Sequence, residues 1–177
     1  MKKSLYILIL TAIAATSFAA KVTKVELAYQ NGETVARIEV SGQIRFTHQT
    51  EIPKDGKPDR VIVELDIGPQ HLNLAGTVHG GVLAALADIA GSLSGLYCAT
   101  KGNVRRAVTL SLNTSFTGQA SSGRIRAIGH KRAGGISIYF SSIDVVNEHG
   151  QIIALGEAVN RYRKGSEGMH GVPAQTY

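Results

Sequence analysis

The sequence predicts an α+β fold in which a curved antiparallel sheet wraps around one central helix. After residue 20, one stretch shows sustained helical periodicity, at residues 80–99. On both sides of it, short runs of alternating apolar and polar residues end at turn-forming Gly, Pro and Asn residues, which is typical of strands. The 177 residues are 44% hydrophobic and 18% charged, so the chain suits one or two small globular domains rather than a disordered segment.

The first 19 residues have the pattern of a secretory signal peptide. Lys2 and Lys3 precede an apolar run at residues 5–15, and Ser17-Phe18-Ala19 is a small-x-small cleavage site. The run is shorter than the roughly 20 residues of a membrane-spanning helix, so we expect cleavage and no stable membrane anchor, with a retained anchor as the alternative. The pattern predicts export to the periplasm, and a cytoplasmic protein if the signal is not functional.

Residues 20–55 are predicted to form a β-hairpin region and a linker. Two alternating runs flank Asn31-Gly32, a pair that favours a type I′ hairpin turn, and a third run follows near residues 44–46. Residues 51–60 contain Pro53, Gly56 and Pro58, which interrupt the strand pattern. We therefore expect a boundary near residue 55, with a second domain at residues 56–164.

Residues 80–99 are expected to form a helix with two opposed faces. One face is bulky, with Val82, Leu86, Ile89, Leu93 and Leu96, and the other is small, with Gly81, Ala85, Asp88, Ser92, Gly95 and Ala99. Both faces can be buried. A carboxylate in the small face costs several kcal/mol to bury unpaired. Asp88 should therefore be hydrogen-bonded, at a crevice, or used in chemistry.

Five strands are expected around this helix. They span residues 61–67, 107–116, 124–130, 136–146 and 151–162, and the turn at residues 147–150 pairs the last two antiparallel. In the second, strict alternation places Thr109 on a polar face that could line a site, opposite the core face of Leu112. The polar, Gly-rich residues 165–177 are expected to be a flexible tail.

The segment most suggestive of chemistry leads into the helix, from Asn73 to the Thr77-Val78-His79-Gly80-Gly81 run. Glycines at a helix start let a ligand approach the backbone, and the unpaired first-turn N–H groups can stabilise an oxygen that gains negative charge. The segment lacks the Gly-Lys-Ser/Thr of a P-loop. A nucleophile elbow is excluded because Leu93 stands where serine is needed.

With Asp88 nine residues after His79, this motif resembles the hot-dog-fold acyl-CoA thioesterases of the phenylacetate-pathway (PaaI-like) type, over residues 58–164. The resemblance implies hydrolysis of an acyl-CoA to free acid and coenzyme A, in a homodimer or homotetramer with active sites between subunits. It implies no cofactor besides the coenzyme A of the substrate, and no metal.

The resemblance also implies residue roles. Gly80, with help from Gly81, would present N–H groups to the thioester carbonyl, while His79 and Asn73 would orient substrate and water. Asp88 would be general base or nucleophile. Thr109 would hold the attacking water. Structural alternatives stay open for individual residues: a turn or cap for Asn73, a satisfied structural histidine for His79, and an ordinary strand position for Thr109.

The net charge of +6 allows an anionic ligand. Basic residues that could attract coenzyme A phosphates are Arg105, Arg106, Lys131 and Arg132, and the alternative is a solvated basic face. No aromatic residues interleave with them, so nucleic acid is not expected as a partner. The single Cys98 excludes an intramolecular disulfide.

The N-terminal region departs from the thioesterase pattern. Residues 21–66 are similar to part of a periplasmic AMIN domain in their strand, Asn31-Gly32, strand pattern and in the stretch at residues 58–65. This supports an alternative function, an exported, non-catalytic binding module that docks on the cell wall or a secretion partner while the hot-dog unit dimerises. Export and a coenzyme A substrate point to different compartments.

Overall fold

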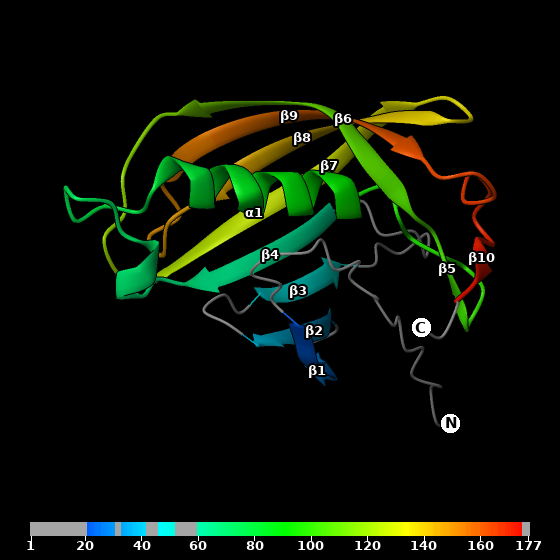
Figure 1. The fold of residues 1–177 in the computed structure, drawn as a ribbon, viewed down its shortest axis with the longest axis horizontal. Coiled ribbons are helices and arrows are strands. Elements are labelled where there is room, and N and C mark those ends of the chain that lie inside the picture. The colour runs from blue at the N-terminus through cyan, green and yellow to red at the C-terminus, as the bar shows by residue number, and fades with distance from the viewer. Residues whose placement is uncertain (1–20, 31–32, 42–45, 52–59, 175–177) are drawn as a thin grey trace.

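The computed structural model of the protein describes residues 21–30, 33–41, 46–51 and 60–174. One antiparallel sheet curves around a single long helix, α1 (Gly80–Leu93), as Figure 1 shows. This confirms the predicted fold class. The order along the sheet is β1 (Lys21–Gln30), β2 (Glu33–Ser41), β3 (Phe46–Glu51), β4 (Arg60–Asp66), β7 (Arg124–Gly134), β8 (Ile138–Val146), β9 (Ile152–Tyr162) and β6 (Ala107–Phe116).

The first three strands form an antiparallel meander that extends the sheet beyond β4. Gln30 pairs with Glu33, as the predicted hairpin requires, although its turn at residues 31–32 lies outside the described residues. Strand β3 then pairs with β4, from Thr47 opposite Glu64 to Glu51 opposite Arg60. One edge of the helix-wrapping strands is therefore covered by the chain itself. The predicted boundary near residue 55 and the signal peptide also lie outside the described residues.

The helix contacts the sheet along a face that matches neither predicted one and lies roughly opposite the predicted small face. Its buried residues are Leu83, Leu86, Ala87, Ala90 and Gly91, spaced i, i+3, i+4, i+7 and i+8. Gly81 and Ala85 of the predicted small face are not buried, and Asp88 is half-buried. The predicted burial of the small face is therefore wrong for the helix itself, where this face is open, whereas Gly95, beyond the end of the helix, is buried.

The helix and the sheet approach each other closely because small residues meet at the contact. A Cβ added to Gly129 of β7 would collide with the main-chain carbonyl of Ala90, and one added to Gly91 would lie 2.9 Å from Ile143 Cδ1 and 3.2 Å from Ala158 Cβ. Larger side chains would push α1 away from the sheet. The core around this contact includes the fully buried Ile125, Ile143 and Val145.

The helix ends at Leu93, six residues before the predicted end. Two tyrosine hydroxyl groups from the sheet donate hydrogen bonds to main-chain carbonyls at and just after this end. Tyr139 donates to Ser92 O at 2.6 Å, and Tyr162 donates to Gly95 O at 3.0 Å. Burial raises the pKa of the Tyr139 phenol, which keeps it protonated as a donor. Gly95 lies against the Tyr139 ring, where a Cβ would clash. These long-range contacts stop the helix where local periodicity would continue it.

Residues 165–174 are not the flexible tail that the sequence predicts. Ser166 is 1% exposed, and β10 (Val172–Pro173) pairs with β5 (Asn103–Val104) in a small second sheet, which Figure 1 places beside the C-terminal end of α1. Ala174 N also donates to Gly102 O at 3.0 Å. The segment is thus held by backbone pairing despite its polar, Gly-rich composition.

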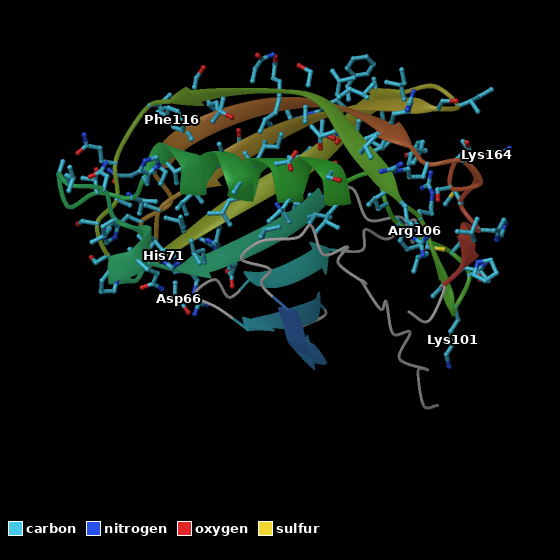
Figure 2. The ribbon with its side chains drawn as sticks, in the orientation of Figure 1. Asp66, His71, Lys101, Arg106, Phe116 and Lys164 are labelled. Atoms are coloured by element: carbon cyan, nitrogen blue, oxygen red, sulfur yellow. The ribbon has the colours of Figure 1, made fainter. Side chains whose placement is uncertain are left out.

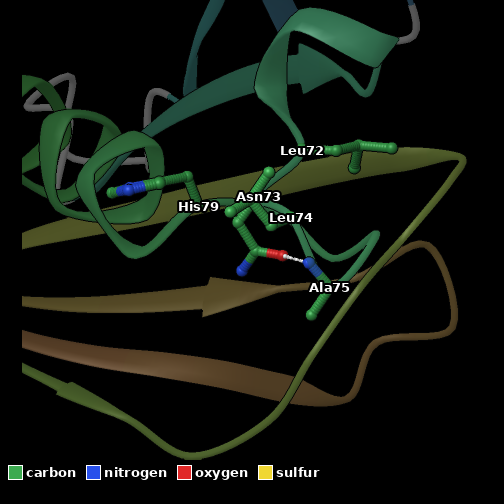
Figure 3. Close-up of a pocket in the computed structure, with 5 residues that line it drawn as sticks. All are labelled: Leu72, Asn73, Leu74, Ala75 and His79. Atoms are coloured by element: carbon green, nitrogen blue, oxygen red, sulfur yellow. Dashed lines mark hydrogen bonds between the residues drawn. The ribbon is translucent and has the colours of Figure 1, made fainter.

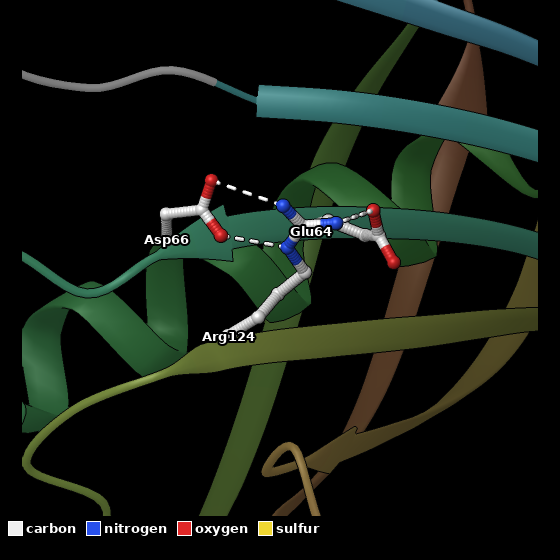
Figure 4. A network of polar contacts seen from close by, with 3 residues as sticks. All are labelled: Glu64, Asp66 and Arg124. Atoms are coloured by element: carbon white, nitrogen blue, oxygen red, sulfur yellow. Dashed lines mark hydrogen bonds and ion pairs between the residues drawn. The ribbon is translucent and has the colours of Figure 1, made fainter.

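A short 3-10 helix, η1 (Pro69–His71), follows β4. The join of β4 to β7 carries a surface ion-pair network, in which Arg124 donates to Asp66 at 2.6 Å and approaches Glu64 at 3.4 Å (Figure 4). The hydrogen bond to Asp66 raises the pKa of the Arg124 guanidinium. Because Arg124 and Asp66 are mostly exposed, the network contributes at most about 1 kcal/mol to the free energy of unfolding.

In the described part of the chain, no helix has the length and apolarity to cross a membrane.

Candidate active site

The loop before the helix is built around the side chain of Asn73. Its Oδ1 accepts hydrogen bonds from the N–H groups of Ala75 at 2.9 Å and Thr77 at 3.2 Å, and its Nδ2 donates to Thr77 Oγ1 at 3.1 Å. Asn73 is therefore a turn residue. The contact with Thr77 uses one of the two Nδ2 protons, so the other can still face a ligand.

This loop borders a shallow open hollow beside the start of α1, which Figure 3 shows. Leu74 is fully exposed at the tip of the loop, which is unusual for a leucine. The hollow is lined by Leu72, Asn73, Leu74, Ala75 and His79. Two of the predicted site residues, Asn73 and His79, therefore share one surface.

His79 caps the helix. Its Nδ1 accepts a hydrogen bond from Gly81 N at 2.9 Å, so the neutral imidazole carries its proton on Nε2 and presents it as a donor on the exposed side of the residue. The cap uses the N–H of Gly81. Among the described contacts no protein acceptor takes the N–H of Gly80, so this group is the first-turn donor open to a ligand oxygen.

Phe116 is a neighbour of this donor that the sequence did not reveal. A Cβ on Gly80 would lie 3.1 Å from the tip of the Phe116 ring, so an added methyl group would push this ring slightly aside. Phe116 is 56% exposed, and Figure 2 shows it above the N-terminal part of α1. The open N–H of Gly80 is thus flanked by an apolar surface that suits an uncharged acyl group.

Asp88 lies on the open side of α1 and accepts a hydrogen bond from a side chain of the edge strand β6. Thr109 Oγ1 donates to Asp88 Oδ1 at 2.7 Å, so the structure brings these two predicted residues together. The contact depends on a β-bulge, because Thr109 pairs with Asn160 whereas Ser111 already pairs with Val159. The extra residue, Leu110, breaks the predicted alternation and puts Thr109 on the same face as Leu112.

Gly80 and Asp88 of one protomer cannot act on the same carbonyl. Eight residues separate them along α1, which at 1.5 Å per residue is about 12 Å. A thioester carbonyl bound at Gly80 must receive its nucleophile from a group only a few ångströms away. The two predicted halves of the site therefore lie apart in this protomer.

Arg105 has a structural role in place of the predicted phosphate contact. It is 8% exposed, and four of its five N–H donors are taken by main-chain carbonyls. Nε donates to Ser166 O at 2.9 Å, Nη2 to Glu167 O at 2.9 Å, and Nη1 to Gly95 O and Tyr97 O, both at 3.1 Å. The guanidinium thus ties the segment after β9 to the end of the helix.

The other three basic candidates differ in their surroundings. Lys131 Nζ lies 3.2 Å from Tyr162 Oη on the helix side of the sheet, whereas Arg132 Nε donates to Ser142 at 2.6 Å. The Nη2 atom of Arg106 is buried and has no hydrogen-bond partner among the described residues. In Figure 2 Arg106 lies near the C-terminal end of α1 and His71 near its N-terminal end. The structure therefore does not bring the basic residues of one protomer to its glycine-rich loop.

No group of three His, Cys, Asp or Glu side chains within the described residues is arranged to hold a metal ion.

Comparisons with known proteins agree with this fold. The sequence model of the thioesterase superfamily matches residues 75–154. Acyl-coenzyme A thioesterase 13 of mouse and of human are each 32% identical to this chain over 101 residues, which is 56% of this chain and 70% of theirs. The fold and these matches define a hot-dog thioesterase, as the sequence predicts. The chain belongs to the thioesterase superfamily.

Solved structures show the same relationship. A mutant of the phenylacetic acid degradation protein PaaI from Thermus thermophilus is 28% identical, with a TM-score of 0.50, covering 59% of this chain and 85% of that one. Zebrafish thioesterase superfamily member 2 is 25% identical, with a TM-score of 0.51, covering 59% and 75%. A thioesterase from Haemophilus influenzae, 22% identical with a TM-score of 0.56 over 66% and 78%, shares the fold.

Proposed function

We propose that the protein hydrolyses acyl-CoA thioesters to a free acid and coenzyme A, with Asp88 as general base. Its superfamily assigns it to the thioester hydrolases, and the relatives named acyl-coenzyme A thioesterase support coenzyme A as the leaving group. The observation that carries the proposal is the 2.7 Å hydrogen bond between Thr109 and Asp88 on the open face of α1. A non-catalytic binding module would have no need of this arrangement.

The proposed reaction is a water-mediated acyl transfer. The N–H of Gly80 donates to the thioester carbonyl oxygen and stabilises the negative charge that develops on it. Asp88 takes a proton from a water molecule whose oxygen bonds to the carbonyl carbon. When the tetrahedral intermediate collapses, the carbon–sulfur bond breaks, and the proton held by Asp88 passes to the departing thiolate. His79 Nε2 and Asn73 Nδ2 orient the substrate.

The active site is proposed to lie between two protomers. Gly80 and Asp88 are too far apart along one helix, but Asp88 of one protomer can face Gly80 of another when two small-residue faces meet. The sheet ends at β1 on one side and at β6 on the other. Among the strands that wrap the helix, β6 is the edge, since β3 covers β4, and we place the pairing there. Strand β6 also carries Thr109 and the exposed Leu110, so its pairing would place Thr109 near the interface.

We expect the protein to be a dimer, or a tetramer built from such dimers, with the two sheets continuous across β6. Size-exclusion chromatography with light scattering checks this at micromolar concentration. The N–H of Thr117 bonds Ile153 O of β9, and N–H groups alternate between the two sides of a strand, so the N–H of Thr114 points to the open edge. Replacing Thr114 with proline removes this edge donor and should shift the balance toward monomer. A parent protein that is cleanly monomeric and still active would contradict the intersubunit site.

Arg106, Lys131 and Arg132 are proposed as contacts for the coenzyme A phosphates, supported by their charge. Export through residues 1–19 is also a proposal, supported by the sequence pattern of those residues.

We expect the protein to release free thiol from a panel of acetyl-, phenylacetyl- and longer acyl-CoA substrates. The assay uses the full chain and a thiol-reactive chromophore, and matched acyl-pantetheine substrates report how much the nucleotide part of coenzyme A contributes. Absence of thiol release across the panel from folded, oligomeric protein would contradict the proposed function.

A further inference from the structure

Asn160 is a buried polar residue beside the proposed base. It lies on β9, directly opposite Thr109 of β6 in the register, and it is 0% exposed. Its amide Nδ2 is buried and has no hydrogen-bond partner among the described residues. A buried N–H donor without an acceptor costs about 1–3 kcal/mol. Such a group calls for a specific explanation.

The contacts of Thr109 supply that explanation. Thr109 Oγ1 lies 2.7 Å from Asp88 Oδ1 and 3.2 Å from Asn160 Oδ1, so both neighbours are oxygen acceptors. A hydroxyl group has one proton to donate and two lone pairs. The shorter contact, to the carboxylate, takes the proton. The second contact, between Thr109 Oγ1 and Asn160 Oδ1, would then bring two oxygen lone pairs together without a proton between them, which is repulsive.

Turning the amide of Asn160 by 180° about its last side-chain bond resolves both problems. The nitrogen and oxygen of an amide have nearly the same shape, so the turn needs no other movement. Nδ2 then lies about 3.2 Å from Thr109 Oγ1 and donates to a lone pair of the hydroxyl. The carbonyl oxygen takes the former place of Nδ2, where an unpaired acceptor is less costly than an unpaired donor.

We propose that Asn160 is a positioning residue for the hydrolysis, acting through a relay from Asn160 Nδ2–H to Thr109 Oγ1 and from Thr109 Oγ1–H to Asp88 Oδ1. The relay rests on the proposed function of Asp88. The relay keeps the Thr109 hydroxyl donating its hydrogen bond to the Asp88 carboxylate. One lone pair of the Thr109 oxygen is then left to accept a hydrogen bond from the attacking water. The other proton of that water then points to Asp88, which orients the water oxygen toward the carbonyl carbon.

The activity test uses Asn160→Leu, which keeps the branching of the side chain and removes the donor. We expect kcat to fall about tenfold with KM nearly unchanged and the folded state retained. In a Thr109→Val background, where the relay is already broken, the same substitution should cause almost no further loss. Ser141→Ala is the matched control, because Ser141 is a buried hydroxyl on β8 that bonds Gly91 O and Ser94 instead of Asp88. It should leave kcat unchanged.

A structural test does not depend on catalysis. With the Asn160 side-chain amide labelled with 15N in the full-length protein, its protons should show nuclear Overhauser contacts to Thr109, and the amide resonance should move in Thr109→Val. Absence of these contacts overturns the relay even if Asn160→Leu proves unstable. Parent kcat in Asn160→Leu, or an equal loss in the Thr109→Val background, also overturns it. A parent protein without hydrolysis would contradict the proposed function and leave the amide contacts to decide the geometry.

Discussion

We expect Asp88→Asn to lower kcat for acyl-CoA hydrolysis by about 10² to 10⁴, the usual contribution of a positioned general base. The substitution keeps the size of the side chain and its ability to accept from Thr109 at the 2.7 Å contact, but removes the basic oxygen. Because Asp88 is half-buried on the open face of α1, folding and oligomerisation should persist. Steady-state kinetics with circular dichroism and light scattering separate loss of the base from loss of structure.

Asp144→Asn is a matched control for this prediction, since Asp144 lies on β8 away from the open face of the helix, and its activity should equal that of the parent. Hydrolysis by Asp88→Asn at the parent rate would contradict the role of Asp88. A single turnover in H₂¹⁸O tests for the nucleophilic role that the sequence left open. Label on Asp88 shows that water attacked the aspartyl carbon of an anhydride, which requires a nucleophilic carboxylate, and we expect label only in the product acid.

We expect Gly129→Ala to lower the free energy of unfolding by about 3 kcal/mol, at the upper end of the usual cost of overpacking. The added methyl group meets the main-chain carbonyl of Ala90, which cannot rotate aside as a flexible side chain would. The helix must move away from the sheet, and the contacts of Ala87 and Gly91 loosen with it. Urea unfolding of the parent and the variant measures the difference.

Gly135→Ala is the control for the packing argument. Its added methyl group would have no atom within 4 Å, so the stability should change by less than about 0.5 kcal/mol. Equal unfolding midpoints for Gly129→Ala and the parent would contradict the view that backbone contact between α1 and β7 sets the spacing of helix and sheet.

Local patterns were sufficient to predict most of the fold. The strand at residues 107–116 was predicted with its observed bounds, because alternation and turn residues are visible in a short window. The helix end was missed because the hydroxyl groups of Tyr139 and Tyr162, from strands far along the chain, donate to the carbonyls of Ser92 and Gly95 at and just after the end of the helix. The bulge at Leu110 was missed because a bulge depends on how β6 pairs with β9.

In the candidate site, too, local motifs could be predicted and contacts between distant residues could not. Asn73, His79, Gly80 and Asp88 lie close together in the sequence, so their motif could be recognised. Asn160 is 51 residues from Thr109, and no local pattern distinguishes it from other strand asparagines. Arg105 was misplaced for a related reason: its charge suggested a phosphate ligand, whereas its donors are occupied by carbonyls that only the folded chain brings near.

The hydrogen bonds of Arg105 determine when the end of α1 can become buried during synthesis of the chain. Two of its acceptors, the carbonyls of Gly95 and Tyr97, lie just upstream of it, but the other two belong to Ser166 and Glu167, 61 and 62 residues downstream. Before Ser166 and Glu167 have been synthesised, the guanidinium has half of its carbonyl partners and must remain hydrated. Burial of the end of α1 therefore waits until these two residues have emerged. A chain that stops before Ser166 would keep a half-solvated cation at the end of α1.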